Sequence, residues 1–211
     1  MGVSAVIFDF GGVILTSPFE AFARYERDNG LPAGFVRRLN ATDPDTNAWA
    51  RLERSEVDAA GFAELFEAEG RAAGHEIDAR ALLALLAGEV RPAMVDALRR
   101  CHDRLKTALL TNNFVIPGAA GDALPELPMA GLADLFDVVI ESSKVGLRKP
   151  DTAIYELACL ELGVAPSEAV FLDDLGVNLK PARAMGMTTI KVDEPDRAIA
   201  ELERVVGFPL R

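Results

Sequence analysis

Four groups of polar side chains in this sequence each come soon after a short apolar run, and their chemistry suits a metal ion and a phosphate group. They are Asp9, the pair Thr111-Asn112, Lys149 and the pair Asp173-Asp174. Three carboxylates brought together would raise one another's pKa unless a cation lay between them. Oxygen ligands of this kind suit Mg²⁺, while lysine, threonine and asparagine side chains can bind phosphate oxygens. We therefore expect a local cationic pocket for Mg²⁺ and a small phosphorylated metabolite.

Each group also has an ordinary structural explanation. A single Asp after a strand is most often a turn or cap residue, Thr111-Asn112-Asn113 could be a plain turn, and Lys149 alone is more often a solvated loop lysine. The doublet Asp173-Asp174 is less ordinary, because adjacent like charges after an apolar strand cost free energy. The coincidence of all four groups at strand ends favours a functional site.

The apolar runs are short and alternate with stretches of helical periodicity, a pattern typical of buried parallel strands joined by right-handed crossovers. Ligand sites of such sheets lie at the carboxyl ends of the strands, so the four groups should meet there. The sequence predicts an α/β fold, a Rossmann-like three-layer sandwich with a parallel sheet. Its strands are expected at residues 3–8, 107–110, 138–140, 170–172 and 189–192.

The first two expected strands are too far apart for one crossover, so a subdomain is inserted between them. At its start Ser17 could cap a helix, with Pro18 at the first helical position and Glu20 completing a capping box. We predict a small all-helical cap over residues 16–92 and a core domain formed by residues 1–15 and 93–211. Cap helices are expected at 48–53, 59–74 and 78–87, with a turn at 42–47. Trp49, Phe62 and Phe66 are expected to form its apolar centre, although Trp49 could also line a substrate cleft.

In the core domain, amphipathic helices are expected at 93–104, 152–162, 179–185 and 196–205. Gly186 fits a left-handed cap at the end of the third of these. Residues 118–131 are rich in Gly and Pro and form a long loop that is either functional or mobile. His75 and His102 fall on helical stretches remote from the strand ends, so we expect no catalytic role for them.

The composition narrows the classes of partner. The chain has 22 basic and 33 acidic residues and a net charge of −11, so its surface should repel nucleic acid and anionic membranes. No signal peptide or membrane span is evident, and the two cysteines, Cys101 and Cys159, lie in apolar helical patterns as expected of buried free thiols. We expect a cytoplasmic protein that is a monomer or a homodimer.

The four groups, in this order, resemble the motifs of the haloacid dehalogenase-like superfamily, and the insert resembles the C1-type cap of its subfamily IA. Residues 139–150 and 170–183 are especially similar to the N-terminal phosphatase domain of soluble epoxide hydrolase. The resemblance implies that Asp9 attacks phosphorus to give an aspartyl-phosphate. It also implies that Mg²⁺ is held by Asp9, by the backbone carbonyl of Gly11, and by Asp174 with Asp173 in support. Thr111, Asn112 and Lys149 take the positions of the second and third motifs.

One position departs from the family pattern. The family's phosphatases carry a second aspartate where this chain has Gly11, and that aspartate protonates the leaving group and later activates water. Loss of a general acid/base typically costs on the order of 10² to 10⁴ in rate, and less when the leaving group is already stable. The sequence predicts a slow phosphatase that prefers sugar 1-phosphates or acyl phosphates and has a long-lived phospho-Asp9.

Two other functions remain open at this point. A metal-independent 2-haloacid dehalogenase also lacks the second aspartate, but it usually has tyrosine in place of Gly11 and does not need the Asp173-Asp174 doublet. Alternatively, the chain could be a non-catalytic descendant that keeps the pocket to bind a ligand or a partner.

Overall fold

The sheet has five parallel strands in the order β3-β2-β1-β4-β5. The computed structural model describes residues 2–85, 88–113 and 131–211. Within them the strands are β1 (Ala5–Phe8), β2 (Lys106–Thr111), β3 (Val138–Glu141), β4 (Ala169–Asp173) and β5 (Thr188–Lys191). Each strand lies within two residues of the range expected from its apolar run. The predicted α/β fold is confirmed.

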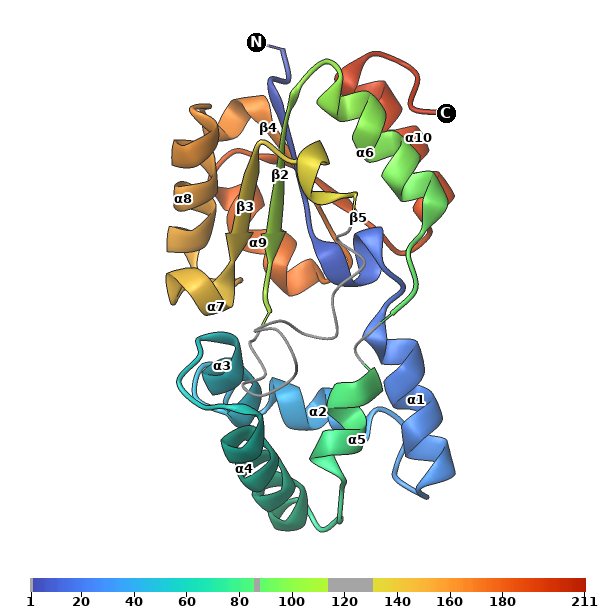
Figure 1. The fold of residues 1–211 in the computed structure, drawn as a ribbon, viewed down its shortest axis with the longest axis vertical. Coiled ribbons are helices and arrows are strands. Elements are labelled where there is room, and N and C mark those ends of the chain that lie inside the picture. Colours follow the sequence, from blue (N-terminus) through green and yellow to red (C-terminus); the bar gives the residue numbers. More distant parts are fainter. Residues whose placement is uncertain (1, 86–87, 114–130) are drawn as a thin grey trace.

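Helices cover both faces of the sheet because successive side chains of a strand point to opposite sides. In β1, Val6 and Phe8 pack in one apolar cluster with the helices α6 (Pro92–His102) and α10 (Pro195–Val206). Ala5 and Ile7 pack in a second cluster with α8 (Thr152–Leu162) and α9 (Gly176–Ala184). Figure 1 shows the resulting three layers.

The segment between β1 and β2 is helical and has an apolar cluster of its own. Trp49 lies at the centre of this cluster, with its ring centroid 4.9 Å from that of Phe62 and 5.9 Å from that of Phe66. The helices lie beyond the carboxyl ends of the strands (Figure 1). They are α1 (Pro18–Asp28), α2 (Phe35–Ala41), α3 (Ala48–Glu53), α4 (Ala59–Ala72) and α5 (Ala79–Ala84). The boundaries proposed for a cap and a core domain stay a prediction.

The capping box expected at the start of this segment is wrong for Ser17. Pro18 does begin α1, but the Ser17 hydroxyl makes no cap hydrogen bond and donates to Asp174 Oδ2 at 3.2 Å. A carboxylate is the stronger acceptor, and it draws the hydroxyl away from the helix. The side chain of Glu20 lies outside the described residues.

Helix α2 was not expected, because no Ser, Thr, Asp or Asn side chain stands at its N-terminus to cap it. Gly34 stands at the cap position with a φ of 71°. The buried Glu26 carboxylate accepts hydrogen bonds from the N–H groups of Gly34 and Val36, at 2.6 and 2.9 Å, and so caps the helix from a distant position. The loop expected at 118–131 lies, apart from Gly131, outside the described residues, as do residues 86–87 of the helix expected at 78–87.

Both cysteines are free and buried, as the sequence predicts. Cys101 lies in the apolar cluster on one face of the sheet and Cys159 in the cluster on the other, so the sheet separates the two thiols. Burial raises the pKa of Cys101 to about 12. Among the described parts of the chain, no helix combines the length and the apolar character needed to cross a bilayer.

Candidate active site at the carboxyl ends of the strands

Asp9, Asp173 and Asp174 converge where β1 and β4 end. One oxygen from each carboxylate lies within 4.8 Å of the others. The convergence follows from the register, since Phe8 is opposite Leu172 and the N–H of Asp9 donates to the carbonyl of Leu172 at 2.9 Å. The two neighbouring strands therefore deliver three carboxylates to one point, as the sequence predicts.

Lys149 reaches the same cluster from the loop between α7 (Ser142–Val145) and α8. Its side chain is 1% exposed, and its Nζ lies 2.7 Å from Asp9 Oδ1 and 2.8 Å from Asp173 Oδ2. Burial lowers the pKa of Lys149, but the carboxylates of Asp173 and Asp9 outweigh it and raise that pKa above its usual value. Lys149 is therefore a fixed positive charge inside the cluster.

Asp173 is held entirely by protein donors. It is fully buried, and besides Lys149 it accepts a hydrogen bond from the N–H of Leu175 at 2.8 Å. The Asn178 side-chain amide donates to both of its oxygens, at 3.1 and 3.0 Å. Sequence reasoning missed Asn178; the signal was a polar residue in the first turn of a helix that directly follows the doublet. These bonds assign Asp173 to holding Lys149, and they leave Asp9 and Asp174 as the carboxylates with open oxygens.

The environment of Asp9 and Asp174 is unbalanced in charge. Burial raises the pKa of Asp9 to about 8, against the lowering effect of Lys149 and with a further rise from Asp173. Burial and the neighbouring Asp173 raise the pKa of Asp174 to about 6. Asp9 Oδ1 accepts from Lys149 and from the N–H of Phe10, whereas Oδ2 has no donor among the described residues. One lysine does not offset three carboxylates.

This donor set fits a hard divalent cation. The open groups are carboxylate oxygens of Asp9 and Asp174, and the backbone carbonyl of Gly11 belongs to the turn that follows Asp9. Mg²⁺ prefers a few carboxylate oxygens completed by water and substrate phosphate. A cation here would also relieve the repulsion that raises the pKa of both aspartates.

The two glycines of that turn are in different situations. Gly12 has a φ of 80°, and a Cβ added to it would lie 2.3 Å from Asp174 Oδ2, so no larger residue fits there without moving that carboxylate. Gly11 has an ordinary extended backbone, with φ −69° and ψ 128°, and an added Cβ would meet nothing within 4 Å. The missing carboxylate at Gly11 therefore leaves open space and is not demanded by the backbone.

Thr111 and Asn112, at the end of β2, differ in their hydrogen bonding. Thr111 is buried, and its hydroxyl has no hydrogen-bond partner among the described residues. The Asn112 amide donates to the carbonyl of Lys149 at 2.9 Å and to Glu53 Oε2 at 3.2 Å, and its oxygen accepts from the N–H of Lys149 at 2.8 Å. The structure thus brings Asn112 to the backbone of Lys149, and Thr111 keeps the free donor.

Neither histidine lies at the cluster, as expected. Nδ1 of His102 lies 3.2 Å from the hydroxyl of Thr107, near the amino end of β2. The ring of His75 packs edge-on against Phe35 in the helical insert, with the centroids 4.8 Å apart. Proton transfer by histidine is therefore not part of this site.

Comparison with known proteins points in the same direction as the geometry. The chain is 38% identical over 215 residues to acyl-CoA dehydrogenase family member 10 of Mus musculus, which is 98% of this chain and 19% of the mouse protein. It is 33% identical over 222 residues to bifunctional epoxide hydrolase 2 of Sus scrofa, covering 100% of this chain and 40% of that protein. The chain thus corresponds to less than half the length of these two relatives. It is 32% identical to phosphatase MT3486 of Mycobacterium tuberculosis (strain CDC 1551 / Oshkosh), covering 92% of this chain and 88% of that one.

Solved structures share the fold at low identity. A HAD family enzyme of Bacteroides thetaiotaomicron, solved with magnesium and inorganic phosphate, has a TM-score of 0.61 at 18% identity, over 92% of this chain and 96% of that one. L-2-haloacid dehalogenase of Xanthobacter autotrophicus, with chloropropionic acid covalently bound, has a TM-score of 0.61 at 23% identity, over 96% of this chain and 82% of that one. A family model described as haloacid dehalogenase-like hydrolase matches residues 3–186. Since that match spans β1 to β4, the carboxylate cluster and Lys149, the chain belongs to the haloacid dehalogenase-like hydrolases.

Proposed function

We propose that this hydrolase is a Mg²⁺-dependent phosphatase that acts on a small phosphate ester through a covalent aspartyl-phosphate on Asp9. The observation that carries the proposal is the asymmetry of the Asp9 carboxylate. Its Oδ1 is held by Lys149 and by the N–H of Phe10, whereas Oδ2 has no donor among the described residues. One oxygen is fixed and the other is available as a nucleophile.

The reaction requires little more than this placement. Asp9 Oδ2 attacks phosphorus, the bond from phosphorus to the leaving oxygen breaks, and that oxygen departs with the electron pair. Water then attacks phosphorus and the bond from phosphorus to Asp9 Oδ2 breaks, which returns the electron pair to the carboxylate. The water protons leave with inorganic phosphate or pass to solvent. Lys149 holds Asp9 in position and adds positive charge beside the phosphoryl group, while the Thr111 hydroxyl can donate to a phosphate oxygen. Mg²⁺, held by Asp174, by the Gly11 carbonyl and by the Asp9 oxygen that does not attack, would neutralise negative charge on that group.

The open space at Gly11 sets the class of substrate. With no carboxyl group at this position, nothing in the turn after Asp9 protonates the leaving oxygen. The leaving group must then be a stable anion, as in acyl phosphates or sugar 1-phosphates. Among the relatives, phosphatase MT3486 and sesquiterpene phosphatase astK of Aspergillus oryzae carry names that support phosphate-ester chemistry. The predicted cap over residues 16–92 would limit the substrate to a small molecule.

The test measures phosphate release from acetyl phosphate, glucose 1-phosphate and a simple alkyl phosphate, each with Mg²⁺ and with chelator. We expect kcat/KM to fall in the order acyl, sugar 1-phosphate, alkyl phosphate, with all activity lost on chelation. Asp9→Asn should abolish turnover and also abolish the rise in Tm that Mg²⁺ and beryllofluoride give the native protein.

Two results would overturn the proposal. Chloride release from 2-chloropropionate in chelator would indicate a dehalogenase, which uses the aspartate without metal. Equal activity of the native protein and Asp9→Asn would show that the turnover does not arise at this carboxylate, and would favour a binding protein.

A further inference from the structure

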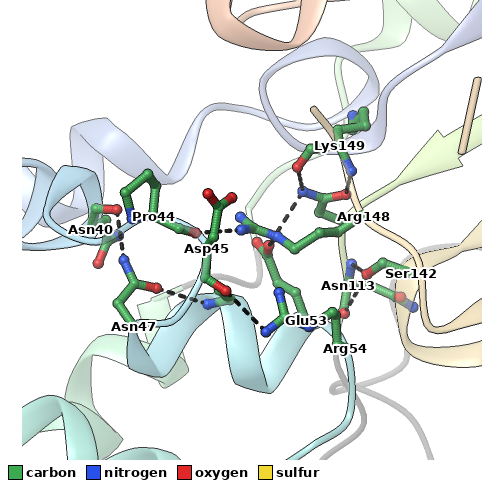
Figure 2. Close-up of polar contacts among 12 residues, drawn as sticks. Asn40, Pro44, Asp45, Asn47, Glu53, Arg54, Asn113, Ser142, Arg148 and Lys149 are labelled. Carbon is green, nitrogen blue, oxygen red and sulfur yellow. Dashed lines mark hydrogen bonds and ion pairs between the residues drawn. The ribbon is translucent and has the colours of Figure 1, made fainter. Parts of the chain in front are cut away.

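An ion pair joins the inserted helices to the loop that carries Lys149. The Nε of Arg148 lies 2.6 Å from Glu53 Oε2, although the two residues are 95 positions apart in the sequence. Glu53 is the last residue of α3, and Arg148 directly precedes Lys149. Their side chains are only 16% and 17% exposed, so the pair is shielded from solvent on most sides. Figure 2 shows Glu53 and Arg148 with their polar contacts.

Neighbouring contacts tie the same two segments together. Arg148 Nη1 donates to the carbonyl of Pro44 at 2.7 Å, so this one side chain contacts both α3 and the turn that precedes it (Figure 2). The Ser55 hydroxyl donates to the carbonyl of Ser143, in α7, at 3.1 Å. Residues 44–55 of the insert therefore lie directly on the loop that leads to Lys149.

Glu53 also acts on Lys149 through Asn112. The Asn112 amide has two hydrogens, and they are donated to Glu53 Oε2 and to the carbonyl of Lys149. The Asn112 oxygen accepts from the N–H of Lys149. The Asn112 side chain thus hydrogen-bonds to both the N–H and the carbonyl of Lys149. Glu53 fixes the orientation of the Asn112 side-chain amide.

The contact between Glu53 and Arg148 is stable only while both charged groups stay together. Burial raises the pKa of Glu53, and Arg148 opposes that rise, so the carboxylate depends on Arg148 at this position. A buried carboxylate that loses its charged partner raises the free energy of the folded state. If the two segments move apart, both charges are instead exposed to water and this penalty disappears. The ion pair of Arg54 with Glu56 on the same segment is different, because both residues belong to the insert and Glu56 is exposed.

We propose that Glu53 is a positioning residue which, through Arg148 and Asn112, makes the placement of Lys149 depend on contact between the inserted helices and the strand ends. The inference rests on the proposed function, in which Lys149 holds the nucleophile Asp9. When the insert is seated, Glu53 orients Asn112, Asn112 holds the backbone of Lys149, and the ammonium meets Asp9. When the insert lifts, that chain of contacts is broken, so catalysis occurs in the seated state.

The first test needs no turnover. Native-state amide hydrogen exchange is measured at the N–H of Lys149, with the N–H of Asn113 as internal reference, because Asn113 donates to Ser142 within the core. In Glu53→Ala and Arg148→Ala we expect exchange at Lys149 to accelerate by about tenfold while Asn113 is unchanged, since only the local opening becomes easier. Glu56→Ala is the matched control and should leave both amides unchanged. Unchanged exchange at Lys149 in Glu53→Ala would overturn the proposal.

The second test separates positioning from proton transfer. Glu53→Gln keeps an oxygen that can accept from Arg148 and Asn112, so we expect it to retain most of the native kcat/KM and the native pH profile. Glu53→Ala should lower kcat/KM by about tenfold, because the competent state is less populated. Arg148→Ala combined with Glu53→Ala should be no worse than the poorer single variant, because residues that act as one unit are not additive.

Two outcomes of the second test contradict the inference. If Glu53→Gln is as slow as Glu53→Ala and one limb of the pH profile is lost, Glu53 transfers protons and does not act by position. If the two single losses add in the double variant, the residues act independently. A native protein without phosphatase activity would defeat the proposed function alone, and the exchange at Lys149 would still decide whether Glu53 holds that loop.

Discussion

Gly12 lies against the carboxylate of Asp174, whereas Gly11 faces open space, although the two residues are adjacent in one turn. Gly12 is required by the left-handed backbone and by the approach of the carboxylate. Gly11 has a backbone that any residue adopts, so the turn does not depend on glycine there, and a side chain at this position would change the groups that the site offers without changing the turn.

Replacing Gly11 by Asp should therefore restore an acid/base group without a structural penalty. An added Cβ meets nothing within 4 Å, so the backbone need not shift and the Tm measured with Mg²⁺ should stay close to that of the native protein. The kcat/KM for an alkyl phosphate, which reports the steps up to departure of the leaving group, should rise by a factor on the order of 10² to 10⁴, and the kcat/KM for an acyl phosphate should change little because its leaving group needs no proton. A folded Gly11→Asp variant with unchanged alkyl phosphatase activity would contradict this account of the defect.

Gly12→Ala, unlike a substitution at Gly11, should disturb the structure of the turn. The methyl group would overlap Asp174 Oδ2, and a non-glycine residue at positive φ costs about 1 to 2 kcal/mol by itself. We expect a lower Tm and a Mg²⁺ requirement shifted to concentrations higher by about tenfold or more, since outer contacts of a metal site commonly contribute that much. The matched variant is Gly11→Ala, which has room for its methyl group; equal behaviour of the two alanine variants would refute the steric argument.

At the scale of elements, the parallel register of β1 and β4 does most to build the site. Asn178, in the first turn of α9, then holds Asp173 by donating to both carboxylate oxygens. Tyr155 in turn donates to the carbonyl of Asn178 at 2.8 Å. Helix α9 thus holds Asp173 in place, and Asp173 in turn holds Lys149.

Asn178→Ala should weaken both the fold and the reaction. It leaves a fully buried carboxylate with fewer donors, which costs about 1 to 3 kcal/mol, and it loosens the partner of Lys149. Denaturant unfolding measures the first effect and kcat the second. Tyr155→Phe removes one neutral hydrogen bond and should cost about 1 kcal/mol with a smaller loss of kcat. A larger loss of kcat in Tyr155→Phe than in Asn178→Ala would show that the amide is not the important contact.

The sequence predicted the elements with short-range signals and missed those that depend on distant contacts. The strands and the carboxylate cluster were predictable, because apolar runs define parallel strands and their carboxyl ends share one edge. Helix α2 was not, because its cap is Glu26 and not an adjacent residue. Ser17 was misassigned because the competing acceptor, Asp174, is 157 positions away. The pairing of Glu53 with Arg148 left no local trace for the same reason.

At the scale of the whole molecule, folding forces together carboxylates that the unfolded chain keeps apart. The pKa of Asp9 rises from 3.8 to about 8 and that of Asp174 from 3.8 to about 6, both mainly through burial. The metal-free folded state therefore binds protons more tightly than the unfolded state. The stability from this source is fully present below about pH 4 and is lost as the pH rises through 6 and then 8.

A divalent cation should reverse that loss. Since Mg²⁺ competes with protons for the same oxygens, its effect on Tm should be small at pH 5 and should grow steadily up to pH 8. Thermal unfolding with Mg²⁺ and with chelator, in half-unit pH steps, measures the difference. Asp174→Asn removes one titrating ligand and should reduce both the pH slope and the Mg²⁺ effect. A Mg²⁺ effect that does not vary with pH would contradict a site at these aspartates.

The central place of β1 has a consequence for biosynthesis. All four of its residues are buried between β2 and β4, which begin only at Lys106 and Ala169. During synthesis on the ribosome β1 therefore emerges long before either neighbouring strand, and its apolar side chains have no sheet in which to pack. The helical insert, with an apolar cluster of its own, is complete in the interval and can fold first. The nascent chain thus contains the whole helical insert before β4, which ends at Asp173, has been made.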